Sequence, residues 1–180
     1  MPLSGVSLSA DDKAVDASTS ARFPGLHPGF PAQCWVVVEQ PRGEPHRIRW
    51  EPSCGQFVRT ALRALGHARG FTGVYGWIAG TGVPPDPHHD VMVLTEASPQ
   101  PGDILEATIC GMFRRGDGDH KFVAVTSEML AEMATADLHD LPAGKLAEVL
   151  RTYPEVGPGE GWDGARDARV HLATRAPTHD

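Results

Sequence analysis

Residues 75–95 read YGWIAGTGVPPDPHHDVMVLT and decide how the rest of the chain is interpreted. The segment begins with an aromatic and apolar run, continues through a Gly/Pro-rich loop with acids and histidines, and ends in a short apolar run at 91–94 that is typical of a β-strand. Asp90 stands where the loop enters this second predicted strand, a place where loops present polar groups on a rigid scaffold. The pattern predicts two strands and is compatible with a metal or phosphate site at Asp90, or with an ordinary strand start.

Length and composition bound the class of protein. The chain has 180 residues, of which 41% are hydrophobic and 22% are charged, enough for one domain with its own core. A formal net charge of -7 argues against a protein that coats nucleic acid, because such binding depends on neutralising phosphates. No apolar run approaches the roughly 18 residues of a membrane span, so we expect no membrane segment.

We expect a flexible tail over residues 1–30, one folded domain over 31–175 and a short tail over 176–180. The first 20 residues contain three aspartates and lack the basic start and apolar segment of a secretion signal. The three cysteines, Cys34, Cys54 and Cys110, have no CxxC spacing and suit reduced thiols in a cytoplasm. Cys34 and Cys110 lie in apolar runs, so we expect both to be buried.

Alternating polarity and turn residues predict strands first and helices later. The predicted strands, of which the first two form a hairpin, cover residues 34–39, 46–51, 56–59, 75–78, 90–94, 103–113 and 121–126. Residues 60–69 are ambiguous, because Gly66 interrupts a short helical stripe. The predicted helices cover residues 127–133, 141–150 and 163–173. This order favours an α+β fold in which a small barrel has helices packed outside it, mostly C-terminal.

Charged residues gather at the predicted strand ends, namely Glu39, Arg49, Glu51, Asp86, Asp90, Asp117, Asp119 and Lys121. Carboxylates from several strands suit a hard divalent cation, because Mg²⁺ takes oxygen ligands and keeps waters that a phosphate can replace. Basic side chains beside them suit a phosphate group. The alternative is that acids in Gly/Pro-rich loops are solvated turn formers.

Five segments, in order, resemble the soluble family I inorganic pyrophosphatases, which are Mg²⁺-dependent and built on a five-stranded OB-like barrel. The segments are VVVEQP at 36–41, YGWIAGT at 75–81, DVMVLT at 90–95, DHKFVAV at 119–125 and GEGW at 159–162. The resemblance implies that barrel, with helices packed outside. It also implies hydrolysis of pyrophosphate to two phosphates by a metal-activated water, and assembly as a homo-oligomer, which is a hexamer in bacterial members.

The resemblance implies a role for each matching position. The implied metal ligands and acids of the metal site are Asp90, Asp119, Asp117, Glu39 and Glu51. Tyr75 matches the tyrosine beside the attacking water. The implied phosphate-binding residues are Lys121, Tyr153, Arg49 (in place of a family lysine) and one further arginine. That arginine is Arg63 in the ungapped comparison, or Arg59 if the local FVR match is followed.

The loop before Asp90 departs from the family signature D-x-D-P-x-D. It reads PDPHHD over 85–90, so prolines replace both upstream aspartates, and losing a general base typically lowers a rate by about 10²–10⁴. The candidates for that role are Asp86, one residue out of register, His88 and His89. A histidine ligand would move the metal preference from Mg²⁺ towards Mn²⁺ or Zn²⁺. Because neighbouring residues of an extended chain face opposite sides, at most one of the two histidines would enter the site.

Other departures lie at positions that contact phosphate in the family. The first active-site tyrosine falls on Phe71, and Pro154 stands where the family has a lysine. Three functions therefore remain open. The first is pyrophosphate hydrolysis, the second is action of the same fold on another phosphorylated or diphosphate metabolite, and the third is a module that keeps the barrel without catalysis. The first two require a small phosphorylated substrate and no nucleic acid.

Overall fold

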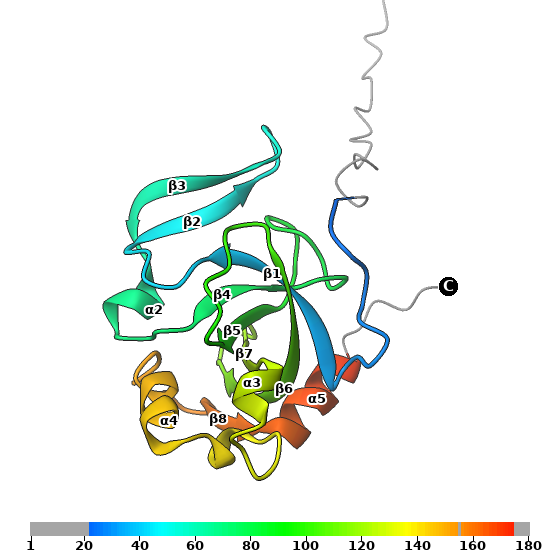
Figure 1. Ribbon diagram of the computed structural model, residues 1–180, viewed down its shortest axis with the longest axis vertical. Helices are drawn as coiled ribbons and strands as arrows, with labels where there is room; N and C mark the ends of the chain where they lie inside the picture. The colour runs from blue at the N-terminus through cyan, green and yellow to red at the C-terminus, as the bar shows by residue number, and fades with distance from the viewer. Residues whose placement is uncertain (1–21, 155, 175–180) are drawn as a thin grey trace, which may run out of the picture.

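Strand β1 (Gln33–Gln40) pairs along both of its edges, and this closes five strands into a barrel (Figure 1). The computed structural model describes residues 22–154 and 156–174. Around the barrel the order is β1, β4 (Val74–Ile78), β5 (Asp90–Leu94), β7 (Lys121–Val125) and β6 (Ile104–Arg114), which returns to β1. Only the β5–β7 pair is parallel among these strand pairs. A short strand, β8 (Gly161–Gly164), extends the sheet beside β6. The predicted α+β class and five-stranded barrel are confirmed.

Period-two alternation divides the barrel strands between two cores. Val91 and Val93 join a cluster fed by all five barrel strands and by Ala168 and Leu172 of helix α5 (Ala165–Thr174). Their neighbours Met92 and Leu94 face a second cluster, which contains Val149 of helix α4 (Ala143–Leu150). These strands are therefore covered on both faces, which explains their continuous apolar sequence.

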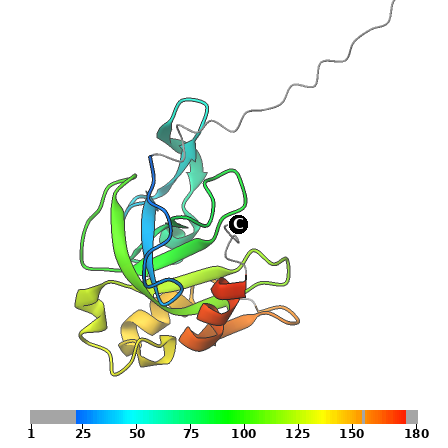
Figure 2. The ribbon, with the colours of Figure 1, turned by 90° about the vertical axis from the view of Figure 1, so that its right-hand side faces the viewer.

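The predicted hairpin of 34–39 with 46–51 is wrong. Strand β2 (His46–Glu51) pairs instead with β3 (Gln56–Arg63), across a turn at which Gly55 has φ +63°. Because β4 and β6 occupy both edges of β1, no edge is left for β2. The β2–β3 hairpin is therefore a separate two-stranded sheet, and it stands at the other end of the molecule from α4 and α5 in both views (Figure 1, Figure 2).

The helical segments are shorter than the sequence predicts. The ambiguous stretch 60–69 continues β3 to Arg63 and then forms one turn, α2 (Leu65–Ala68). Helix α3 (Ser127–Leu130) is also one turn and is followed by η1 (Leu138–Asp140), which was not predicted. The last predicted helix, 163–173, begins later, at Ala165, because residues 161–164 pair with β6. None of the helices in the described part of the chain is both long and apolar enough to cross a bilayer.

The segment before β1 packs on the hairpin. The Phe23 ring lies edge-on to Trp50 of β2 and to Trp77 of β4, with centroids 5.2 Å away in each case. Most of the predicted N-terminal tail, residues 1–21, and all of the predicted C-terminal tail, residues 176–180, lie outside the described residues. Cys34 and Cys110 are buried free thiols, as expected, and Cys54 is exposed.

Candidate active site

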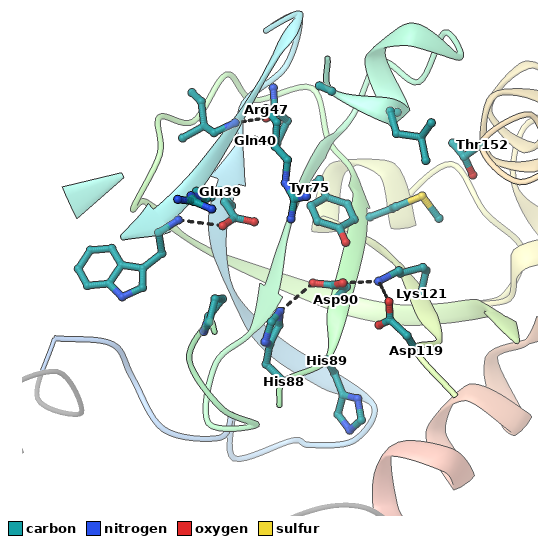
Figure 3. A pocket seen from close by; sticks show the side chains of 18 of the residues that line it. Glu39, Gln40, Arg47, Tyr75, His88, His89, Asp90, Asp119, Lys121 and Thr152 are labelled. Atoms are coloured by element: carbon teal, nitrogen blue, oxygen red, sulfur yellow. Dashed lines mark hydrogen bonds and ion pairs between the residues drawn. The ribbon is translucent and has the colours of Figure 1, made fainter. Parts of the chain in front are cut away.

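A cavity of about 1370 Å³ lies between the barrel and the β2–β3 hairpin, and Figure 3 shows many of the side chains that line it. Its walls come from β1, the hairpin, α2, the loop before β5, the start of β7 and the chain after α4. All thirteen predicted site residues line this one cavity: Glu39, Arg49, Glu51, Arg63, Tyr75, Asp86, His88, His89, Asp90, Asp117, Asp119, Lys121 and Tyr153.

Asp90 and Lys121 form the centre of the site. Each is the first residue of its strand, and the parallel register pairs them directly, so their side chains emerge at the same end of the barrel. The ammonium of Lys121 donates to Asp90 Oδ2 and, at 2.7 Å, to Asp119 Oδ2 (Figure 3). Lys121 is 5% exposed, and burial alone would lower its pKa, but the two carboxylates outweigh this and raise it. The lysine is therefore a fixed cation.

Asp90 receives two further donors. His88 Nε2 lies 3.1 Å from Asp90 Oδ1, and the Tyr75 hydroxyl also donates to this carboxylate. Burial would raise the pKa of Asp90, but the bonds from His88, Lys121 and Tyr75 hold it well below its usual range. Burial and the neighbouring Asp90 raise the pKa of Tyr75 well above normal, so its hydroxyl stays protonated. Asp90 is thus an ionised carboxylate throughout the neutral range.

The two loop histidines face opposite sides. His88 Nδ1 lies 2.7 Å from the carbonyl oxygen of Asp86, while Nε2 faces Asp90, so both ring nitrogens face acceptors. Burial would lower the pKa of His88, but the hydrogen bonds with Asp90 and the Asp86 carbonyl outweigh this and raise it. His89 turns away, with its ring edge-on to Phe122 at 5.3 Å. This is the arrangement that strand alternation requires. Asp86 lies on the cavity wall with an exposed side chain.

Glu39 joins the barrel to the hairpin. Its Oε1 accepts the backbone N–H of Trp50 at 2.9 Å, and the residue is 5% exposed. Burial raises its pKa, although the Trp50 hydrogen bond and the charge of Arg47 act in the opposite direction. The carboxyl is therefore harder to ionise than an ordinary glutamate. A cation bound beside it would favour its ionised form and offset the cost of burial.

The hairpin presents arginines to the cavity. Arg49 pairs with Glu51 at 3.2 Å, and Arg63 lies at the end of β3. Arg47 also lines the cavity and points towards Glu39 and Tyr75 (Figure 3), although the sequence analysis did not propose it. The signal was present, because Arg47 and Arg49 are two residues apart on one strand and share a face.

Arg59 does not line the cavity. It pairs with Glu44 at 2.6 Å and approaches His46 at 3.0 Å on the hairpin surface. Of the two arginines that the sequence left open, Arg63 is thus the one beside the proposed substrate space.

Two predicted site residues are held by neighbours outside the central cluster. Asp117 pairs with Arg115 at 2.7 Å, which lies in the same loop. The Tyr153 ring stacks on Phe113, with centroids 4.8 Å apart and planes at 8°. Asp117 is exposed, whereas the Tyr153 side chain is held by ring stacking.

The carboxylates at the centre of the site suit one hard divalent cation better than a cluster of metal ions. Among the described residues, no group of three or more His, Cys, Asp or Glu side chains is arranged to hold a metal. Asp90 and Asp119 nevertheless meet at Lys121, and one or two carboxylates together with phosphate oxygens and water are a usual Mg²⁺ environment. These two carboxylates would hold the ion, with Glu39 nearby.

The fold and the cavity together define a class of protein, namely a small OB-like barrel with carboxylates and basic side chains at one end. This combination of charges suits a phosphorylated ligand. The sequence profile of the inorganic pyrophosphatase family matches residues 36–168. Inorganic pyrophosphatases of Sulfolobus acidocaldarius and Thermus thermophilus are 29% and 28% identical, covering 78% and 76% of this chain and 88% and 83% of theirs. The crystal structure of inorganic pyrophosphatase from Ehrlichia chaffeensis superposes with a TM-score of 0.65 at 17% identity, over 84% of this chain and 98% of that one. The chain belongs to the inorganic pyrophosphatase family.

Proposed function

We propose that the protein hydrolyses pyrophosphate to two phosphates with the help of a divalent cation. Family membership supports a phosphoanhydride hydrolase. The observation that carries the proposal is the cavity in which the Asp90–Lys121–Asp119 cluster faces arginines of the hairpin. Carboxylates for a cation and cations for phosphate oxygens are what phosphoryl transfer requires.

Each residue has a proposed task that follows from its contacts. Lys121 neutralises phosphate charge next to the cation, while Arg47, Arg49 and Arg63 contact phosphate from the hairpin side. Tyr75 and His88 hold the Asp90 carboxylate in a single orientation by donating to it. Tyr153 completes the phosphate contacts at the rim. A cation held by Asp90 and Asp119 would supply an activated water and offset the charge that develops on phosphate.

The proton acceptor we propose is Asp86. It lines the cavity as an exposed carboxylate, whereas both ring nitrogens of His88 are engaged with Asp86 and Asp90, and His89 turns towards Phe122. Asp117, Glu39 and Glu51 are proposed to order water around the cation. We propose Mg²⁺ as the cation because the proposed ligands are oxygens, with Mn²⁺ as the first alternative.

The test is phosphate release from pyrophosphate with Mg²⁺, Mn²⁺ or Zn²⁺, comparing wild type with Asp90→Asn. The substitution keeps the shape and removes the charge, so we expect kcat/KM to fall by about 10²–10⁴ with the fold intact by circular dichroism. Asp167→Asn makes the same change on the exposed surface of α5 and should leave the rate near wild type. Absence of turnover by folded wild type with every cation would favour the non-catalytic alternative.

We further propose a cytoplasmic homo-oligomer, a hexamer by family membership, that binds neither nucleic acid nor membrane. The net charge of -7 and the free buried thiols support this environment. Sedimentation velocity at micromolar concentration tests the assembly, and a monomer would contradict it. Retention of the protein on heparin or DNA at physiological salt would contradict the absence of nucleic-acid binding.

A further inference from the structure

Apolar side chains line the cavity besides the charged ones, and they include Ile48, Leu62, Ala64, Leu65, Phe71 and Met92. The part of the lining formed by residues 62–66 and Phe71, which also contributes Arg63, is called the apolar end. Figure 3 shows Thr152 on the other side of Tyr75 from His88. The volume of about 1370 Å³ exceeds the roughly 300–1,000 Å³ of ordinary ligand pockets. Two phosphate groups alone would leave the apolar end unfilled.

Leu62 and Leu65 are the accessible part of this apolar end. Leu62 lies at the end of β3 and is 63% exposed, and Leu65 begins α2 and is 50% exposed. Their positions are fixed, because the intervening Ala64 is buried and donates its N–H to the Pro45 carbonyl at 3.0 Å. Phe71 is buried next to Gly66 of α2 and belongs to the same core cluster as Met92. A ligand that covered the leucines would gain hydrophobic stabilisation in proportion to the apolar area removed from water.

Basic residues connect the two ends. Arg63 directly follows Leu62 on β3, and Arg47 and Arg49 lie on the partner strand. A ligand with phosphates against the arginines and Lys121 would therefore extend any attached organic group over Leu62 and Leu65. The reverse orientation would place a hydrocarbon against Asp90 and Lys121, where their charges would lose hydration without compensation.

We infer that the cavity accepts diphosphate monoesters of short aliphatic alcohols, with the hydrocarbon chain lying on Leu62 and Leu65. This deepens the proposed function, on which it rests, by naming a wider substrate class for the same site. The accessible carbon surface at this end is aliphatic, whereas the rings of Phe71 and Tyr75 are buried or bonded. An aliphatic chain therefore fits these two leucines better than a nucleobase, which stacks best on an aromatic ring or an arginine plane.

The reaction is the same hydrolysis with a different leaving group. The oxygen of water bonds to the terminal phosphorus, and the bond from that phosphorus to the bridging oxygen breaks. The products are inorganic phosphate and an alkyl monophosphate, and the proton released from water passes to the proposed base and then to solvent. No oxidant or second substrate is needed.

Binding is measured first, by calorimetry with methylene-bridged analogues of pyrophosphate, methyl diphosphate and isopentyl diphosphate, which are not hydrolysed. The two esters carry the same charge and differ only in chain length. Each methylene that reaches the leucines should tighten binding by up to about fourfold. With two or more carbons of its chain covered, isopentyl should bind about tenfold tighter than methyl. Phosphate release from the hydrolysable esters is then measured beside that from pyrophosphate.

The variant Leu62→Ser/Leu65→Ser should remove the chain-length preference. Both side chains are exposed, so folding is not at risk. The matched control is Val58→Ser, because Val58 lies on β3 with Leu62, is 39% exposed and is outside the cavity. If wild type hydrolyses pyrophosphate but binds the methyl and isopentyl esters equally tightly, this inference is wrong while the proposed function stands. An equal loss for both esters, or a change in assembly state, would overturn it by placing the leucines in another role. Tighter binding of ADP than of the isopentyl ester would overturn the aliphatic assignment. Absence of pyrophosphate hydrolysis would instead count against the proposed function.

Discussion

The ammonium of Lys121 lies between the carboxylates of Asp90 and Asp119 and donates to an oxygen of each. It occupies the space between the two acids that would hold a cation. Lysine and cation therefore compete for the same pair of charges. A cation that takes over the two carboxylates would free the ammonium to pair with a phosphate group beside it.

Replacing Lys121 with Met should strengthen cation binding while weakening catalysis. Without metal, the carboxylates lose their counter-charge, and we expect unfolding free energy to fall by on the order of 2 kcal/mol, discounted because Asp119 is half exposed. Mn²⁺ should restore more stability to the variant than to wild type, and kcat/KM for pyrophosphate should fall by about 10–100-fold.

Thermal unfolding in EDTA and in Mn²⁺ measures the stability changes. Lys145→Met is the control, because Lys145 pairs with Glu148 away from the cavity. An identical Mn²⁺ shift in wild type and Lys121→Met would show that the lysine and the cation do not compete.

The pairing of Asp90 with Lys121 marks the limit of local sequence reasoning. Alternation and turn residues located both strands, but the two residues are 31 positions apart, and β6 lies between their strands in sequence. Nothing local specifies that β5 and β7 run parallel and begin at the same end. The order of the motifs, through resemblance to a family, placed Asp90 and Lys121 in one site but did not specify how their strands pair.

The hairpin shows the opposite case, in which local reasoning misled. Residues 34–39 and 46–51 are two strands joined by a turn, and a hairpin between them is the simplest prediction. Barrel closure overrides it, because β4 and β6 take both edges of β1. By contrast, the two-residue spacing of Arg47 and Arg49 on one strand predicts that both face the same side, although resemblance to the family implies a role for Arg49 alone.

Arg63 and Arg59 provide a matched pair on one strand. Arg63 lines the cavity, whereas Arg59 is bound to Glu44 outside it. Arg63→Met should raise KM for pyrophosphate by about tenfold, since one charge-assisted phosphate contact is lost. Arg59→Met should change KM by less than about twofold, because exposed ion pairs contribute little. Steady-state kinetics at saturating cation distinguishes the two variants. Equal effects on KM would mean that the substrate does not lie beside Arg63 as the cavity indicates.

Phe23 is expected to position the hairpin. Its ring bridges Trp50 and Trp77, and the neighbouring Arg22 lies over Trp50 and bonds the Gly55 carbonyl. Phe23→Ala should loosen the hairpin that carries the cavity arginines, raising KM about five- to tenfold with a smaller effect on kcat, and should shift tryptophan emission to longer wavelength.

Phe30→Ala is the control for this variant. It truncates a partly buried ring of the same segment that packs on the barrel core instead of the hairpin. Both variants should lose stability, but only Phe23→Ala should raise KM. If KM rises equally in both, the effect is general destabilisation, and a positioning role for Phe23 is wrong.

Glu39 should reveal a conflict between stability and function. Because its pKa is raised in the fold, the carboxyl favours the folded state fully only below the pKa of the unfolded chain, and this contribution is lost as pH rises through the folded pKa. Glu39→Gln keeps the acceptor for the Trp50 N–H and cannot ionise. In EDTA it should therefore be more stable than wild type at pH 8, by on the order of 1 kcal/mol, and no more stable at pH 4. Its kcat/KM should fall, since a carboxylate beside the cation is lost.

Glu51→Gln should change stability with the opposite sign, because hydrogen bonds from Ser53 and the charge of Arg49 lower the pKa of Glu51. Thermal unfolding across this pH range measures both variants, and a stability gain for Glu39→Gln that is the same at pH 4 and pH 8 would show that desolvation of the Glu39 charge is not its origin.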